Sequence, residues 1–100
     1  MAEKKPVQLQ IKVDDSIGQG EYANFLSILH NPTEFVLDFG RVMPGVAEVR
    51  VKSRILATPF NAKRFMETLK HNIDLYEKSY GPIRTDFGPE PLPPSSEIPS

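Results

Sequence analysis

The spacing of apolar residues changes once along this chain, from every second residue before Thr58 to every third or fourth residue after it. Strands place successive side chains on opposite faces, whereas helices bring residues three and four apart onto one face. The sequence therefore predicts an α+β fold, a four-stranded antiparallel meander followed by one long C-terminal helix. The strands are expected over residues 7–13, 22–30, 35–42 and 47–56.

The helix is predicted to run from Pro59 to Tyr80. Thr58 is a favourable N-cap, Pro59 suits the first helical position, and Gly81-Pro82 provides a stop. One face of this helix is expected to be apolar, and its residues are Ala62, Phe65, Met66, Leu69, Ile73, Tyr76 and Tyr80.

The turn Asn31–Glu34 predicts a hairpin with a two-residue loop between the second and third strands. This loop length pairs Leu26 with Phe39 and Ile28 with Leu37. Apolar residues then lie opposite apolar residues on one face of the sheet, as a half-buried antiparallel sheet requires.

The connection between the third and fourth strands is harder to predict, because a plain Pro-Gly turn would place apolar residues opposite charged ones. A one-residue slip exchanges the two faces of a strand. Matching the faces instead pairs Phe39 with Val49 and requires a bulge or irregular loop near Pro44-Gly45. The ion pairs expected from this register are Asp38–Arg50 and Glu34–Arg54.

The sheet offers more apolar surface than one helix can cover. A helix is ~10–12 Å across, whereas four strands spaced ~4.8 Å apart span roughly 19 Å. We therefore expect a homo-oligomer, a dimer or larger, rather than a monomer with an exposed patch. The residues expected at the interface lie on the face turned away from the helix, and they are Phe25, Leu29, Val36 and Leu56.

The two ends of the chain differ in composition from its centre. Six of the 10 prolines lie in residues 82–100, where they remove backbone donors and prevent regular structure. We expect disordered residues at 1–6, a single domain over 7–81 and a disordered tail over 82–100. The Pro91–Pro94 run fits either a polyproline II ligand or a solubilising tail.

Composition excludes several classes of function. The chain has no cysteine and a formal net charge of −1, which argues against thiol chemistry, cysteine-ligated metals and a dedicated nucleic-acid binder. His30 and His71 lack the spacing of a metal site, and no catalytic motif is present. We expect a cytoplasmic, non-enzymatic protein without cofactor, metal or membrane span.

One group of polar residues is a possible ligand-binding surface. A basic sheet face with aromatic residues is one way to bind single-stranded RNA, although nearby acidic residues reduce its field. A solvated or ion-paired face is the alternative. The residues are Asp38, Arg41, Arg50, Lys52 and Arg54.

An ordered series of short motifs resembles a family of small bacterial proteins known as domain of unknown function 3467. The match covers residues 11–83 and implies no assigned activity. The order of strands and helix is also similar to that of SecB, an export chaperone that oligomerises and holds unfolded chains. The matching motifs are Tyr22-x-Asn24, His30-Asn31-Pro32-x-Glu34-Phe35-x-x-Asp38-Phe39, Pro44-Gly45, Lys52-x-Arg54, Pro59-x-x-Ala62-Lys63, Asn72-Ile73 and Tyr76-Glu77.

These observations together predict a homo-oligomeric interaction protein, an adaptor or a chaperone-like holder with a possible protein partner. The alternative is a nucleic-acid-associated accessory protein that uses the basic sheet face. A small-molecule enzyme would need a deep pocket lined by His30, Asp38 or Tyr22.

Overall fold

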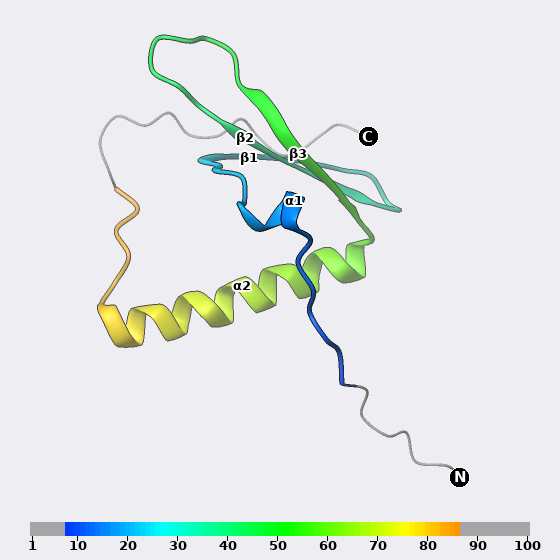
Figure 1. Ribbon diagram of the computed structural model, residues 1–100, viewed down its shortest axis with the longest axis vertical. Helices are drawn as coiled ribbons and strands as arrows, with labels where there is room; N and C mark the ends of the chain where they lie inside the picture. Colours follow the sequence, from blue (N-terminus) through cyan, green and yellow to red (C-terminus); the bar gives the residue numbers. More distant parts are fainter. Residues whose placement is uncertain (1–7, 87–100) are drawn as a thin grey trace.

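The computed structural model describes residues 8–86. A single helical turn, α1 (Asp15–Gly18), precedes a sheet of three antiparallel strands in the order β1-β2-β3. The long helix α2 follows the last strand and lies to one side of the sheet (Figure 1). The strands and helix are β1 (Phe25–His30), β2 (Phe35–Arg41), β3 (Arg50–Ala57) and α2 (Pro59–Tyr80). The predicted α+β class is therefore confirmed, with an antiparallel sheet followed by a C-terminal helix.

The register of the β1–β2 hairpin is the predicted one. Leu26 lies opposite Phe39 and Ile28 opposite Leu37. The loop is ordered by the Asn31 side chain, whose Oδ1 accepts hydrogen bonds from Thr33 and from the amide of Glu34 at 2.9–3.0 Å. Asparagine favours such turns because its side chain can bond to backbone amides two and three residues later.

The predicted β2–β3 register is wrong by four residues. Asp38 pairs with Arg54 and not with Arg50, and the connection between the strands is a loop over residues 42–49. The irregular loop expected near Pro44-Gly45 is present within residues 42–49, and the ladder carries a further register shift between Phe39 and Gly40. The pairing of Glu34 with Arg54 is excluded as well, because Arg54 faces Asp38.

Apolar matching on both faces explains the observed register. Val36 lies opposite Leu56, whereas the predicted register would have placed it opposite Lys52. Since cross-strand neighbours on one face interact directly, an aliphatic pair is favoured over an aliphatic residue beside an ammonium group. The predicted register fails because it matches apolar residues on one face of the sheet only.

The predicted bounds of α2 are confirmed at both ends. The Oγ1 atom of Thr58 accepts a hydrogen bond from the amide of Asn61 at 3.2 Å, and Pro59 occupies the first helical turn. Gly81 ends the helix with a φ of 96°, and its amide donates to the carbonyl of Glu77. A positive φ of this size favours glycine, which explains the stop.

The first predicted strand is not formed. Residues 8–13 adopt neither helix nor strand, and α1 follows them where a loop was expected. In Figure 1 this segment leads from α1 past α2 and away from the sheet. A strand needs a neighbour to satisfy its backbone groups, and within the described residues this segment has none.

The described residues contain no apolar core. Across residues 8–86 no apolar side chain is buried, and the buried positions are Asp38 and Gly40. α2 has no buried residue, and side chains on its apolar face such as Leu69 are 62% exposed. The sheet and the helix therefore shield each other only in part within one chain.

The predicted N-terminal disorder at residues 1–6 and residues 87–100 of the predicted tail lie outside the described residues. Residues 82–86 form no helix or strand. The amide of Ile83 donates to the carboxylate of Glu77 at 2.8 Å, which holds this stretch against the end of α2. No helix among residues 8–86 has both the length and the apolar character that a membrane span requires.

Candidate interaction surface

An apolar row crosses all three strands on the sheet face that carries Asp38. Leu29 lies opposite Val36, and Val36 lies opposite Leu56. Leu56 is 60% exposed and Leu29 36% exposed, while Val36 is half-buried. Phe25 belongs to the same face near its other end, opposite Gly40. The four residues expected at an interface thus share one face, which we call the apolar row face.

Asp38 and Arg54 form a two-pronged ion pair on this face. The Nε and Nη2 atoms of Arg54 each donate to one carboxylate oxygen of Asp38 at 2.8 Å. The Asp38 side chain is 7% exposed, whereas that of Arg54 is 60% exposed. The hydrogen-bonded guanidinium lowers the pKa of Asp38 below its ordinary value, against the opposing effect of burial. This carboxylate is therefore held ionised, which does not suit a general acid.

The remaining predicted basic residues gather where β2 ends and β3 begins. Arg41 lies directly opposite Arg50, and Lys52 is the extra residue of the bulge. The guanidinium of Arg41 also lies over the ring of Tyr22, 5.2 Å from its centroid. Like charges opposite each other repel, so an anion bound between Arg41 and Arg50 would relieve this repulsion. An anion gains less at Arg54. Arg54 already has Asp38 as its partner.

Gly40 is a structural requirement that the sequence analysis missed. A Cβ atom at this position would lie 2.8 Å from the carbonyl oxygen of Arg50 and 2.8 Å from Cγ1 of Val49. The backbone of β3 can approach β2 at the bulge because residue 40 lacks a side chain. A glycine inside an otherwise β-rich strand was the signal that could have revealed this approach.

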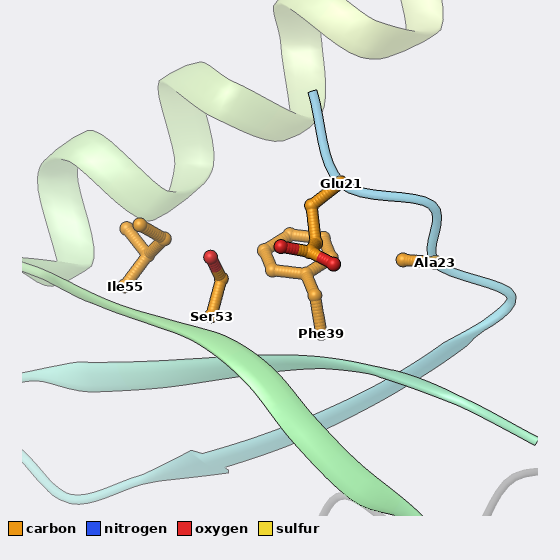
Figure 2. A pocket seen from close by; sticks show the side chains of 5 residues that line it. All are labelled: Glu21, Ala23, Phe39, Ser53 and Ile55. Carbon is orange, nitrogen blue, oxygen red and sulfur yellow. The ribbon is translucent and has the colours of Figure 1, made fainter. Parts of the chain in front are cut away.

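A pocket of about 280 Å³ lies on the opposite face of the sheet. Figure 2 shows Phe39, Ser53 and Ile55 pointing away from the strands on the side where α2 lies, with Glu21 and Ala23 on the segment before β1. Glu21 and Ala23 were not predicted, because they precede the strand and carry no motif. A phenyl ring, an aliphatic chain, a hydroxyl and a carboxylate line this pocket, which can surround a mainly apolar group. Within residues 8–86, no hydrogen bond joins the Ser53 hydroxyl to the Glu21 carboxylate as a nucleophile–base pair would require.

The two histidines have separate surroundings. The ring of His30 stacks on Phe35 with 5.3 Å between centroids, whereas His71 is exposed on α2. Within residues 8–86, no three metal-ligating side chains come together. None of His30, Asp38 and Tyr22 lines the pocket of Figure 2.

Asn24 joins the beginning of β1 to the end of β2. Its Oδ1 accepts from the amide of Val42 at 2.7 Å, and its Nδ2 donates to the Val42 carbonyl at 3.2 Å. A side-chain amide can satisfy a backbone donor and acceptor together. This contact fixes the path by which the chain enters the sheet.

The chain was compared with known families, curated proteins and solved structures. No curated protein and no solved structure matches it, so the expected similarity to SecB is not confirmed. The family comparison gives a match over residues 1–85. The chain therefore belongs to the family described as "Protein of unknown function (DUF3467)".

Proposed function

We propose that this protein is a non-enzymatic homo-oligomer whose role is to bind other proteins, as an adaptor or a chaperone-like holder. The observation that carries the proposal is the lack of any buried apolar side chain across residues 8–86. The apolar row face, the opposite sheet face and the apolar side of α2 each expose large side chains. A second copy of the chain can cover such surfaces symmetrically.

The energetic argument favours a partner over a stable monomer. Burying a large aliphatic or aromatic side chain contributes roughly 1.5–3 kcal/mol, and a small domain has only about 5–15 kcal/mol of net stability. Leu56 at 60% and Leu69 at 62% exposure contribute little of this in a single chain. Assembly that buries Leu56 and Leu69 would add their burial free energy to the stability of the folded state.

The binding role follows from the amount of apolar surface that is left open on both sides of the sheet. Contiguous apolar patches on a protein surface mark sites of interaction with other proteins. The same surfaces can serve self-assembly and the capture of an apolar segment of a partner.

Measuring molar mass across a dilution series tests the assembly. We expect multi-angle light scattering to give a dimer or larger species at micromolar concentration. The melting temperature should rise with protein concentration, because assembly stabilises the folded state by mass action. A monomer at every concentration, with a concentration-independent melting temperature, contradicts the proposal.

A second experiment separates a holder from an adaptor. A chemically unfolded enzyme is diluted into buffer with and without the protein, and its aggregation is followed by light scattering. Suppression at a few-fold molar excess supports a holder. An oligomer that leaves the aggregation unchanged favours an adaptor with a specific partner.

A second candidate function, binding of single-stranded nucleic acid, is favoured by one specific contact. Arg41 faces Arg50 across the ladder and lies over Tyr22, so two cations and an aromatic ring share one corner. Phosphates would relieve the repulsion and a base could stack on the ring. Retardation of single-stranded RNA at low salt that is lost in Arg50→Gln would support this function. Unchanged mobility would reject it.

A further inference from the structure

β1 forms an open edge of the sheet. It pairs with β2 on one side, and no described strand pairs with the other. The amide of Asn31 donates to the carbonyl of Glu34, and hydrogen-bonded pairs alternate along an antiparallel ladder. The backbones of Leu26, Ile28 and His30 therefore face outward, and they leave their donors and acceptors ready for another strand.

The two edges of the sheet are protected differently. β3 carries three cationic residues, Arg50, Lys52 and Arg54, whereas β1 reads Phe-Leu-Ser-Ile-Leu-His and has no Asp, Glu, Lys or Arg. Charged side chains on an edge strand oppose the addition of a further strand. The β1 edge lacks that protection, which is the composition expected of an edge that is covered in the assembled protein.

Residues 8–13 have the pattern of a strand but no strand to pair with among the described residues. Leu9, Ile11 and Val13 alternate with Gln8, Gln10 and Lys12 in a strand pattern. The three apolar residues are 83%, 90% and 61% exposed, respectively. The segment also has the same number of residues as β1, which is six residues long, so one could pair along the whole of the other.

We propose that residues 8–13 of one copy add to the β1 edge of a second copy, and that the exchange is reciprocal. This inference rests on the homo-oligomer proposed above. The occupant is a second copy because the segment leads away from its own sheet in Figure 1. Asn24, held on Val42, also fixes how the same chain enters β1. A two-fold exchange satisfies both open edges and both unpaired segments at once.

The alternation sets the expected orientation of the added strand. Its apolar residues lie on the sheet face of Leu26 and Ile28, while Gln8, Gln10 and Lys12 lie on the face of Ser27. This orientation buries apolar side chains of both strands on the face of Leu26 and Ile28. It places the polar side chains at the border of the apolar row face, beside Ser27. It also predicts which positions can be joined by a disulfide.

Disulfide trapping in the full-length, cysteine-free chain tests the exchange. A chain with Ser27→Cys and an affinity tag is mixed with an untagged chain that carries Gln8→Cys, Gln10→Cys or Lys12→Cys. After mild oxidation, we expect a mixed dimer on a non-reducing gel for at least one of the three, which mass spectrometry assigns to the engineered pair. Ser79→Cys, on exposed α2, replaces Ser27→Cys as the matched control and should give at most one-fifth of that yield.

Other outcomes overturn the exchange and identify the alternative. Cross-linking of Ser27→Cys only with itself means that two β1 edges pair directly. An intrachain disulfide in a chain carrying both cysteines, without mixed dimers, means that each segment covers its own edge. Light scattering on the same mixtures separates the two proposals. A dimer that gives no disulfide rejects the exchange alone, and a monomer rejects the homo-oligomer as well.

Discussion

Asp38 accepts one hydrogen bond on each carboxylate oxygen from the guanidinium of Arg54, both at 2.8 Å. A two-pronged contact of this kind fixes the relative orientation of two planar groups as well as their distance. It lies directly across the β2–β3 ladder, so it also marks the register of the sheet. Loss of this ion pair can therefore be detected as a local change in the β2–β3 ladder.

The first prediction concerns the titration of Asp38. Because Arg54 lowers the pKa of Asp38 in the folded protein, protonation is disfavoured there relative to the unfolded chain. The pair thus stabilises the fold above the unfolded pKa of about 3.9, and this contribution is lost as pH falls through the folded pKa. Carbon-detected NMR of the Asp38 carboxyl group should give a midpoint below the ordinary pKa of an aspartate.

Replacing the partner tests the cause of this shift. Arg54→Gln should raise the Asp38 midpoint, whereas Arg50→Gln should leave it unchanged because Arg50 faces Arg41. The two variants remove the same charge from the same strand, so they form a matched pair. A larger effect of Arg50→Gln would restore the register that the sequence alone predicted.

The second prediction concerns Gly40. Gly40→Ala places a methyl group 2.8 Å from the Arg50 carbonyl oxygen and from Val49 Cγ1, so β2 and β3 must move apart at the bulge. Overpacking of this kind costs typically about 1–3 kcal/mol, and urea denaturation should show that loss. Gly18→Ala is the control, since its Cβ would meet Val13 Cγ1 at 3.8 Å, an ordinary contact. Equal stabilities of the two variants would refute the close approach.

Local sequence signals predicted the elements whose determinants lie close together in the chain. The bounds of α2 follow from Thr58, Pro59 and Gly81, all within a residue or two of the ends that they specify. The β1–β2 register follows from a two-residue loop. In both cases a few neighbouring residues restrict the backbone, so no tertiary information is needed.

The β2–β3 register could not be obtained in the same way, because its determinants are far apart in sequence. The loop of residues 42–49 permits several registers, and the observed one depends on Val36 meeting Leu56 and on the absence of a side chain at Gly40. A strand over residues 8–13 also needs the edge of another strand to pair with, and the periodic pattern of its apolar residues does not show which edge that is. The residue types in the sequence are enough to identify the candidate residues. Their cross-strand partners can be assigned only from the observed pairing of the strands.

The third prediction concerns the N-cap of α2. Thr58→Ala removes the acceptor for the amide of Asn61 and should lower the free energy of unfolding by ~1 kcal/mol. Thr58→Ser keeps a hydroxyl acceptor and is expected to retain most of that stability. Circular dichroism during thermal unfolding provides the comparison. A serine variant as unstable as the alanine variant would mean that the hydroxyl does not cap the helix.

The fourth prediction concerns the apolar side of α2 and its role in assembly. Leu69 is 62% exposed in the single chain, so Leu69→Lys should leave the helix content nearly unchanged. At an interface the same change places an ammonium group among apolar side chains, which costs free energy unless the charge finds a partner. We expect the oligomer to dissociate at least about tenfold more readily, equivalent to ~1.4 kcal/mol, as measured by sedimentation velocity. His71→Lys, an exposed position outside the apolar stripe, should keep the dissociation constant within a factor of two. Equal behaviour of the two variants would place α2 outside the interface and leave the sheet as the assembling surface.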